Sequence, residues 1–128
     1  MAKALVVDDS KTIRTILRRI LCEEKFDVAE AGNGLEALQV IDTCVDSLCL
    51  VLADWNMPEM NGFELLKQMR SRPELNDVKV VMVTTESEMG HIASALEAGA
   101  DEYVMKPFTR EILKEKLQII GTRFPASA

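Results

Sequence analysis

Short apolar runs rich in β-branched residues alternate five times with apolar stripes at helical spacing, and this alternation restricts the chain to one class of fold. The strand-like runs cover residues 5–7, 26–30, 49–53, 78–83 and 103–105, and the helical stripes cover residues 13–21, 35–41, 63–69, 92–99 and 112–120. The runs at 49–53 and 78–83 are apolar without alternation, which is typical of strands buried on both faces. The repeated strand–helix order predicts an α/β fold, a doubly wound sheet of five parallel strands with helices on both faces.

Residues at the expected helix starts agree with these boundaries. Asn33 and Asn61 each stand three residues before a glutamate. This is the spacing of a capping box, in which the first residue caps the helix and the glutamate side chain bonds back to its N–H. Ser10 and Thr109 are the candidate caps of the first and last helices.

Composition narrows the class of protein. A length of 128 residues predicts a single domain over residues 1–128. The net charge of −6 argues against nucleic-acid binding, which usually needs a basic surface. No apolar run approaches the roughly 20 residues of a membrane span, and the first predicted strand begins too early for a signal peptide. We therefore expect a soluble, cytoplasmic monomer whose three cysteines are buried, reduced thiols.

Polar side chains follow four of the five predicted strands. Asp8 and Asp9 follow the first strand, Asp54 the third, Thr84 the fourth and Lys106 the fifth. In an open parallel sheet, ligands bind in the crevice outside the carboxyl ends of the strands. The sequence thus brings three carboxylates, a hydroxyl and an ammonium to one crevice, a set that suits a divalent cation and a phosphoryl group.

The chemistry of these groups sharpens that prediction. Two unit charges about 4 Å apart repel by about 4 kcal/mol at an effective dielectric constant of 20, so the carboxylate cluster needs a cation. Oxygen ligands and a single histidine far along the chain favour Mg²⁺ over zinc. A carboxylate such as Asp54 can attack phosphorus, while Lys106 and Thr84 can bind phosphoryl oxygens. Each residue also has an ordinary alternative, as a helix cap, strand-end turn, surface lysine or strand threonine.

Taken together, these motifs resemble the receiver domains of bacterial two-component response regulators over essentially the whole chain. The similar segments are Val6-Val7-Asp8-Asp9-Ser10, Asp54 through Gly62, Val83-Thr84-Thr85-Glu86, Gly99 through Tyr103, and Lys106-Pro107-Phe108. The likeness is greatest to single-domain chemotaxis receivers of the CheY type. It implies a flavodoxin-like (βα)5 sheet with strand order 2-1-3-4-5.

The resemblance also implies a role for each crevice residue. Asp54 would accept a phosphoryl group from the phosphohistidine of a sensor histidine kinase. Asp9, Asp54 and the backbone carbonyl of Asn56 would bind Mg²⁺ directly, and Asp8 mainly through water. Lys106 would pair with the phosphoryl group.

Further residues would act as switch elements or set the lifetime of the phosphoryl group. Thr84 would move toward the phosphoryl group and Tyr103 would swing inward behind it, which changes the surface of the fourth helix, fifth strand and fifth helix. Asn56 and Glu86 would tune phosphoryl lifetime. Thr85 stands where chemotaxis receivers often carry alanine, a departure that bears on partners rather than on the chemistry.

Receivers hold the bond before Pro107 in the cis form, and the same is expected here. The resemblance predicts a signalling switch with the flagellar switch protein or a phosphatase as candidate partners. Such a switch is not an enzyme acting on a metabolite, because it catalyses only its own phosphorylation and dephosphorylation.

Several alternatives stay open at this stage. A phosphorelay or phosphate-sink receiver would share every motif described above. A haloacid-dehalogenase-type phosphatase uses similar groups but needs an Asp-x-Asp pattern on its first strand, where this chain has adjacent Asp8 and Asp9. A flavin carrier would need a phosphate-binding loop at the same place.

Overall fold

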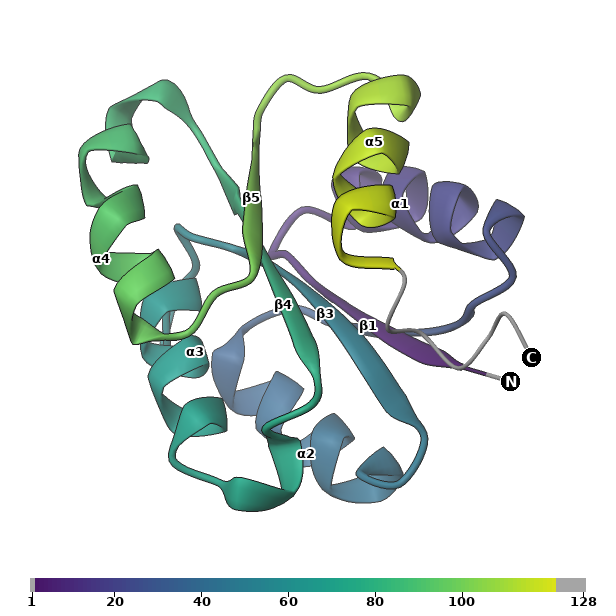
Figure 1. Ribbon diagram of the computed structural model, residues 1–128, viewed down its shortest axis with the longest axis vertical. Coiled ribbons are helices and arrows are strands. Elements are labelled where there is room, and N and C mark those ends of the chain that lie inside the picture. The colour runs from purple at the N-terminus through teal and green to yellow at the C-terminus, as the bar shows by residue number, and fades with distance from the viewer. Residues whose placement is uncertain (1, 122–128) are drawn as a thin grey trace.

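The computed structural model describes residues 2–121, which form one parallel five-stranded sheet (Figure 1). The strands are β1 (Lys3–Val7), β2 (Asp27–Ala31), β3 (Leu48–Asp54), β4 (Lys79–Thr84) and β5 (Glu102–Met105). Their order is β2-β1-β3-β4-β5, and every neighbouring pair is parallel. The predicted α/β fold and its strand order are confirmed.

Helices cover both faces of the sheet. They are α1 (Lys11–Glu23), α2 (Gly34–Cys44), α3 (Gly62–Arg70), α4 (Ile92–Ala98) and α5 (Arg110–Gly121), with short 3-10 helices η1 (Pro73–Leu75) and η2 (Glu86–His91). Figure 1 shows α1 and α5 on one side of the sheet and α2, α3 and α4 on the other. Two separate apolar clusters fill these layers.

Strand β3 takes part in both layers of the core. Leu50 and Leu52 pack in the layer of α1 and α5, whereas Val51 and Ala53 pack in the layer of α2, α3 and α4. All four are at most 1% exposed, as the unbroken apolar run predicts. Asp54 is the last residue of this strand, so its carboxylate starts from a buried segment of the sheet.

Side-chain caps begin the helices where the sequence places them. Ser10 Oγ accepts from the Ile13 amide at 3.3 Å, and Asn33 Oδ1 accepts from the Glu36 amide at 2.9 Å. The corresponding bond at Thr109 comes from the Ile112 amide at 3.1 Å. Each cap satisfies a backbone N–H that has no partner within its helix.

Two expectations about burial are wrong in part. Four residues of the predicted apolar stripes are 42–47% exposed, namely Ile16, Leu35, Leu96 and Ile112. The thiol of Cys22 is exposed on the solvent side of α1, while Cys44 and Cys49 are partly buried; all three are free thiols. A helical stripe spans a wider arc than the part of the helix that meets the sheet, so its margins stay exposed. Within residues 2–121, no helix is both long and apolar enough to cross a membrane.

The end of α1 carries an unusual residue. Lys25 has φ of 72° and stands in the left-handed conformation that glycine normally occupies after a helix. Its N–H bonds the Cys22 carbonyl at 3.1 Å, and the Phe26 N–H bonds the Leu21 carbonyl at 3.1 Å, which completes a Schellman motif.

Lys25→Gly is therefore expected to stabilise the protein by about 0.5–1 kcal/mol. The left-handed conformation costs a residue with a Cβ about 1–2 kcal/mol, and the greater freedom of glycine in the unfolded chain offsets part of that gain. Urea unfolding of the wild type, Lys25→Gly and Lys25→Ala measures the effect. A glycine variant no more stable than the alanine variant would show that the conformation is not strained.

Candidate functional site

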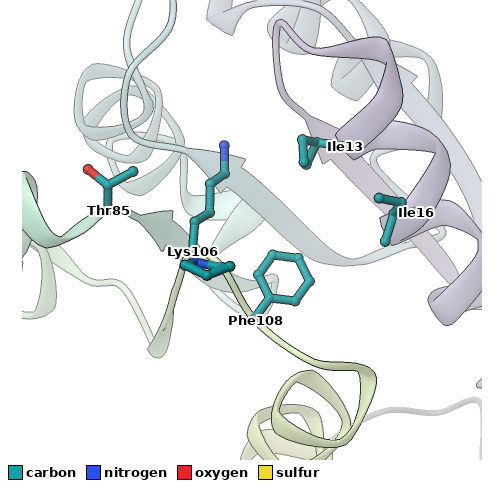
Figure 2. A pocket seen from close by; sticks show the side chains of 6 residues that line it. Ile13, Ile16, Thr85, Lys106 and Phe108 are labelled. Carbon is teal, nitrogen blue, oxygen red and sulfur yellow. The ribbon is translucent and has the colours of Figure 1, made fainter.

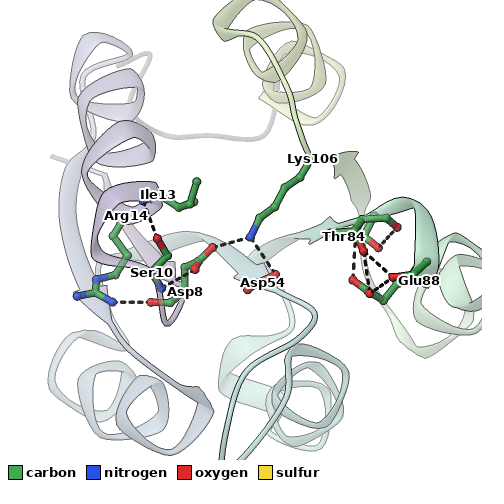
Figure 3. Close-up of polar contacts among 10 residues, drawn as sticks. Asp8, Ser10, Ile13, Arg14, Asp54, Thr84, Glu88 and Lys106 are labelled. Atoms are coloured by element: carbon green, nitrogen blue, oxygen red, sulfur yellow. Dashed lines mark hydrogen bonds and ion pairs between the residues drawn. The ribbon is translucent and has the colours of Figure 1, made fainter.

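The polar residues at the strand ends meet in one crevice. Asp8 follows β1, Asp54 ends β3, Thr84 ends β4 and Lys106 follows β5. Carboxylate oxygens of Asp8, Asp9 and Asp54 all lie within 4.8 Å of one another. Figure 3 shows Lys106 extending from its loop toward Asp8 and Asp54. The juxtaposition follows from the strand order, which places β1, β3, β4 and β5 side by side.

Lys106 joins two buried carboxylates. Its Nζ lies 3.1 Å from Asp8 Oδ2 and 3.3 Å from Asp54 Oδ1. The side chains of Asp8 and Asp54 are only 1% and 6% exposed. Buried ions interact strongly and lose much of their hydration, so removing one partner leaves the others uncompensated.

The backbone around Asp54 and Asp8 is fixed by close contacts. A Cβ on Gly62 would lie 2.3 Å from the Asp54 carbonyl oxygen, so only glycine lets α3 begin this close to β3. The Gly62 N–H donates to the Trp55 carbonyl at 3.0 Å. On the other side, Asp8 Oδ1 accepts from the Ser10 N–H at 2.8 Å, and Arg14 donates to the Asp8 carbonyl.

The charges in the crevice do not balance. Burial and the neighbouring Asp8 carboxylate raise the pKa of Asp54 from its usual 3.8 to about 6, although Lys106 opposes the rise. Burial alone would lower the pKa of Lys106, but the attraction of Asp54 and Asp8 raises it above its usual value. Lys106 is thus a cation paired with the two buried carboxylates of Asp8 and Asp54, and the exposed Asp9 adds a third carboxylate to the cluster.

The other predicted site residues lie around this centre. The Thr84 hydroxyl is fully buried and donates to the Thr85 carbonyl at 3.2 Å. Asn56 is exposed beside Asp54. Tyr103 is partly buried, with Lys116 Nζ 4.6 Å from its ring centroid. The Lys106–Pro107 bond is cis. The side chain of Glu86 falls outside what the structure describes.

Trp55, directly after Asp54, joins an aromatic stack. Its ring lies 5.4 Å from that of Phe63 and 6.0 Å from that of His91, centroid to centroid. The single tryptophan of the chain is therefore packed immediately beside the crevice, where it can report on changes in it.

An apolar hollow of about 480 Å³ opens next to the crevice (Figure 2). Ile13 and Ile16 of α1 line one side, and Phe108 and Pro107 line the other. Lys106 also lines this hollow, so one side chain borders both the apolar surface and the two buried carboxylates.

Two polar groups beside the crevice are not foreseen from the sequence. Arg14 holds the Asp8 backbone, and Glu88 binds the loop after β4. The Thr85-x-x-Glu88 spacing was a usable signal, because it matches the pattern of a helix-capping box. No comparable sequence signal marks Arg14.

Comparison with known proteins decides the family. The family model described as "Response regulator receiver domain" matches residues 4–118. The chain belongs to the response regulator receiver family. This receiver is 44% identical over 119 residues to the Chemotaxis protein CheY1 of Helicobacter pylori, covering 92% of this chain and 95% of that protein. It is also 44% identical to a Chemotaxis protein CheY homolog of Campylobacter jejuni, covering 94% and 93% of the two chains.

Solved structures agree with the sequence relatives. The receiver superposes on the chemotaxis protein CheY4 of Vibrio cholerae with a TM-score of 0.85 and 33% identity, covering 94% of this chain and 98% of that one. A receiver domain protein from Clostridium thermocellum gives a TM-score of 0.87 at 26% identity, with 96% of each chain covered. The phosphatase and flavin-carrier alternatives are not favoured by these matches.

The pKa of Asp54 leads to a pH-dependent stability. Since folding raises this pKa, the folded state binds the proton more tightly than the unfolded chain, and stability is lost as the pH rises from about 4 through about 6. Asp54→Asn should remove the charge and stabilise the metal-free protein above pH 7 by up to about 3 kcal/mol, with the gain vanishing toward pH 4.

Urea unfolding between pH 4 and pH 8 in the presence of EDTA measures this gain. Asp46→Asn, at an exposed aspartate between α2 and β3, is the matched control and should show no such trend. A stability difference between Asp54→Asn and wild type that does not change with pH would contradict the account.

Proposed function

We propose that this receiver is a chemotaxis response regulator that accepts a phosphoryl group from a sensor histidine kinase on Asp54. The observation that carries the proposal is the buried Asp54 carboxylate, which ends a fully packed strand and lies 3.3 Å from the Lys106 ammonium. Its relatives named as chemotaxis proteins match nearly the whole chain, which supports chemotaxis over a phosphate sink or a phosphorelay.

The chain's own groups suit phosphoryl transfer. With a pKa of about 6, Asp54 is mostly ionised at neutral pH yet poorly hydrated, which favours it as a nucleophile. Its oxygen would bond to phosphorus while the bond from phosphorus to the donor imidazole nitrogen breaks, and that nitrogen would keep the electron pair. Lys106 would stabilise the charge on the phosphoryl oxygens from its place beside Asp54.

The crevice also suits Mg²⁺. Three carboxylates converge where one ammonium lies, and this excess of negative oxygen donors is what a hard cation prefers. Asp9, Asp54 and the Asn56 carbonyl would bind the ion directly and Asp8 through water. When bound, Mg²⁺ would offset the charge of the incoming phosphoryl group.

We expect phosphorylation of the crevice to change a surface on the β5 side of β4. Thr84 and Tyr103 would move toward the modified crevice, and Asn56 and Glu86 would affect the lifetime of the phosphoryl group. Thr85, a switch residue beside Thr84, would bear on the choice of partner. The changed surface of α4, β5 and α5 would bind a partner, with the flagellar switch protein or a phosphatase as the candidates.

Receivers are signalling proteins, and this one would turn over only its own phosphoryl group. We expect a cytoplasmic monomer with one domain over residues 1–128 that binds neither nucleic acid nor membrane.

The first test locates the modified residue. Incubation with Mg²⁺ and acetyl phosphate should give one labile adduct per chain, and borohydride trapping followed by peptide mass mapping should place it on Asp54. Asp54→Asn should give no adduct. An adduct on Asp8, with phosphate released over many turnovers, would instead favour the phosphatase.

The second test concerns Mg²⁺. At 100 times its dissociation constant, Mg²⁺ should stabilise the wild type by about 2.7 kcal/mol. Asp9→Ala should stabilise the metal-free protein, because one repelling charge is removed, and should lose most of the Mg²⁺ effect. Thermal melts with and without Mg²⁺ compare these with Asp46→Ala, an exposed control. Equal Mg²⁺ effects in wild type and Asp9→Ala would rule out this ligand set.

A further inference from the structure

The loop that follows β4 is held by a carboxylate that the proposed phosphoryl chemistry does not use. Glu88 Oε1 accepts from the Thr85 N–H at 3.2 Å. Glu88 Oε2 accepts from the Thr85 hydroxyl at 2.8 Å and from the Ser87 hydroxyl at 2.6 Å. Bonds to an ionised acceptor are stronger than those between neutral groups. One side chain thus fixes both the backbone and the hydroxyl of Thr85.

The same segment keeps Thr84 occupied. The Thr85 carbonyl accepts the Thr84 hydroxyl at 3.2 Å and the Glu88 N–H at 3.0 Å. Figure 3 shows Thr84 and Glu88 grouped at the end of β4, apart from the Asp8–Lys106–Asp54 contacts. For its hydroxyl to bind a phosphoryl oxygen on Asp54, Thr84 must give up the Thr85 carbonyl.

Glu88 also lies within electrostatic reach of the crevice. Hydrogen bonds from Ser87 and Thr85 lower the pKa of Glu88, and the positive charge of Lys106 contributes to the same shift. Glu88 therefore remains ionised at neutral pH. A phosphoryl group on Asp54 would add negative charge near Lys106 and would repel this carboxylate.

We propose that Glu88 is a positioning residue that holds the β4–α4 loop closed through Thr85 and Ser87, so that its bonds must break before Thr84 can engage a phosphoryl group on Asp54. This inference rests on the proposed function. Binding to a conformation that is only partly populated is weakened in proportion to that population. The Glu88 contacts would therefore lower the affinity of the crevice for a phosphoryl group.

A purely structural role gives a different result. The Thr85-x-x-Glu88 spacing can simply stabilise the start of η2. In that case, removing Glu88 would lower thermal stability and leave phosphoryl binding unchanged.

Beryllofluoride, an analogue of an acyl phosphate, distinguishes the two roles. It is titrated into the full chain with Mg²⁺, and Trp55 fluorescence reports binding. Glu88→Ala should bind it about tenfold more tightly than wild type, a change equivalent to about 1.4 kcal/mol. Glu88→Gln keeps the shape without the charge and should also bind more tightly. Glu64→Ala is the matched control, because Glu64 makes the equivalent bond to its cap at Asn61 and should leave the affinity unchanged.

If Glu88→Ala binds beryllofluoride no more tightly than wild type, the inference is overturned. If that variant does not fold, Glu88→Gln replaces it, and unchanged or weaker binding by Glu88→Gln overturns the inference. Equal tightening in Glu64→Ala would also overturn it, since the effect would then not be specific to this loop. A wild type that binds no beryllofluoride would overturn the proposed function and this inference together. Binding by the wild type with no change in either Glu88 variant would overturn the inference alone.

Discussion

The ion contacts between Lys106 and two buried carboxylates are the interaction on which the crevice depends. Lys106 comes from the loop after β5, while Asp8 and Asp54 come from β1 and β3, so one ammonium ties together segments nearly 100 residues apart in the chain. Burial and the neighbouring Asp8 carboxylate outweigh the attraction of Lys106, so the pKa of Asp54 still rises to about 6. A rigid sheet edge therefore carries a charge cluster that a bound cation would stabilise.

This imbalance offers a physical basis for switching. A phosphoryl group on Asp54 would compete with the carboxylates for Lys106 and would attract the buried Thr84 hydroxyl, which is now bonded to the Thr85 carbonyl. The loop after β4 would be the element that moves, and the Glu88 side chain holds it through hydrogen bonds to Thr85 and Ser87. Local charge could thus alter a surface formed by α4, β5 and α5 without disturbing the sheet.

The sequence predicts the fold and the crevice because both follow from strong, local patterns. Unbroken apolar runs identify β3 and β4, and parallel topology then forces Asp54 and Thr84 to the same edge. The features that the sequence does not predict depend on tertiary contacts and turn geometry. Exposure of Ile16 and Cys22 depends on how α1 lies on the sheet, and the left-handed conformations of Lys25 and Glu59 depend on turn geometry. The contacts of Glu88 form only once the loop after β4 is folded.

The pKa of Asp54 measures the charge imbalance in the crevice most directly. Carboxyl ¹³C NMR of the metal-free protein as a function of pH would follow this group, with its resonance assigned by its absence from Asp54→Asn. We expect a midpoint near pH 6, because the carboxylate is buried beside Asp8. A midpoint near the usual 3.8 would contradict it, since Asp54 would then be neither desolvated nor repelled by its neighbour.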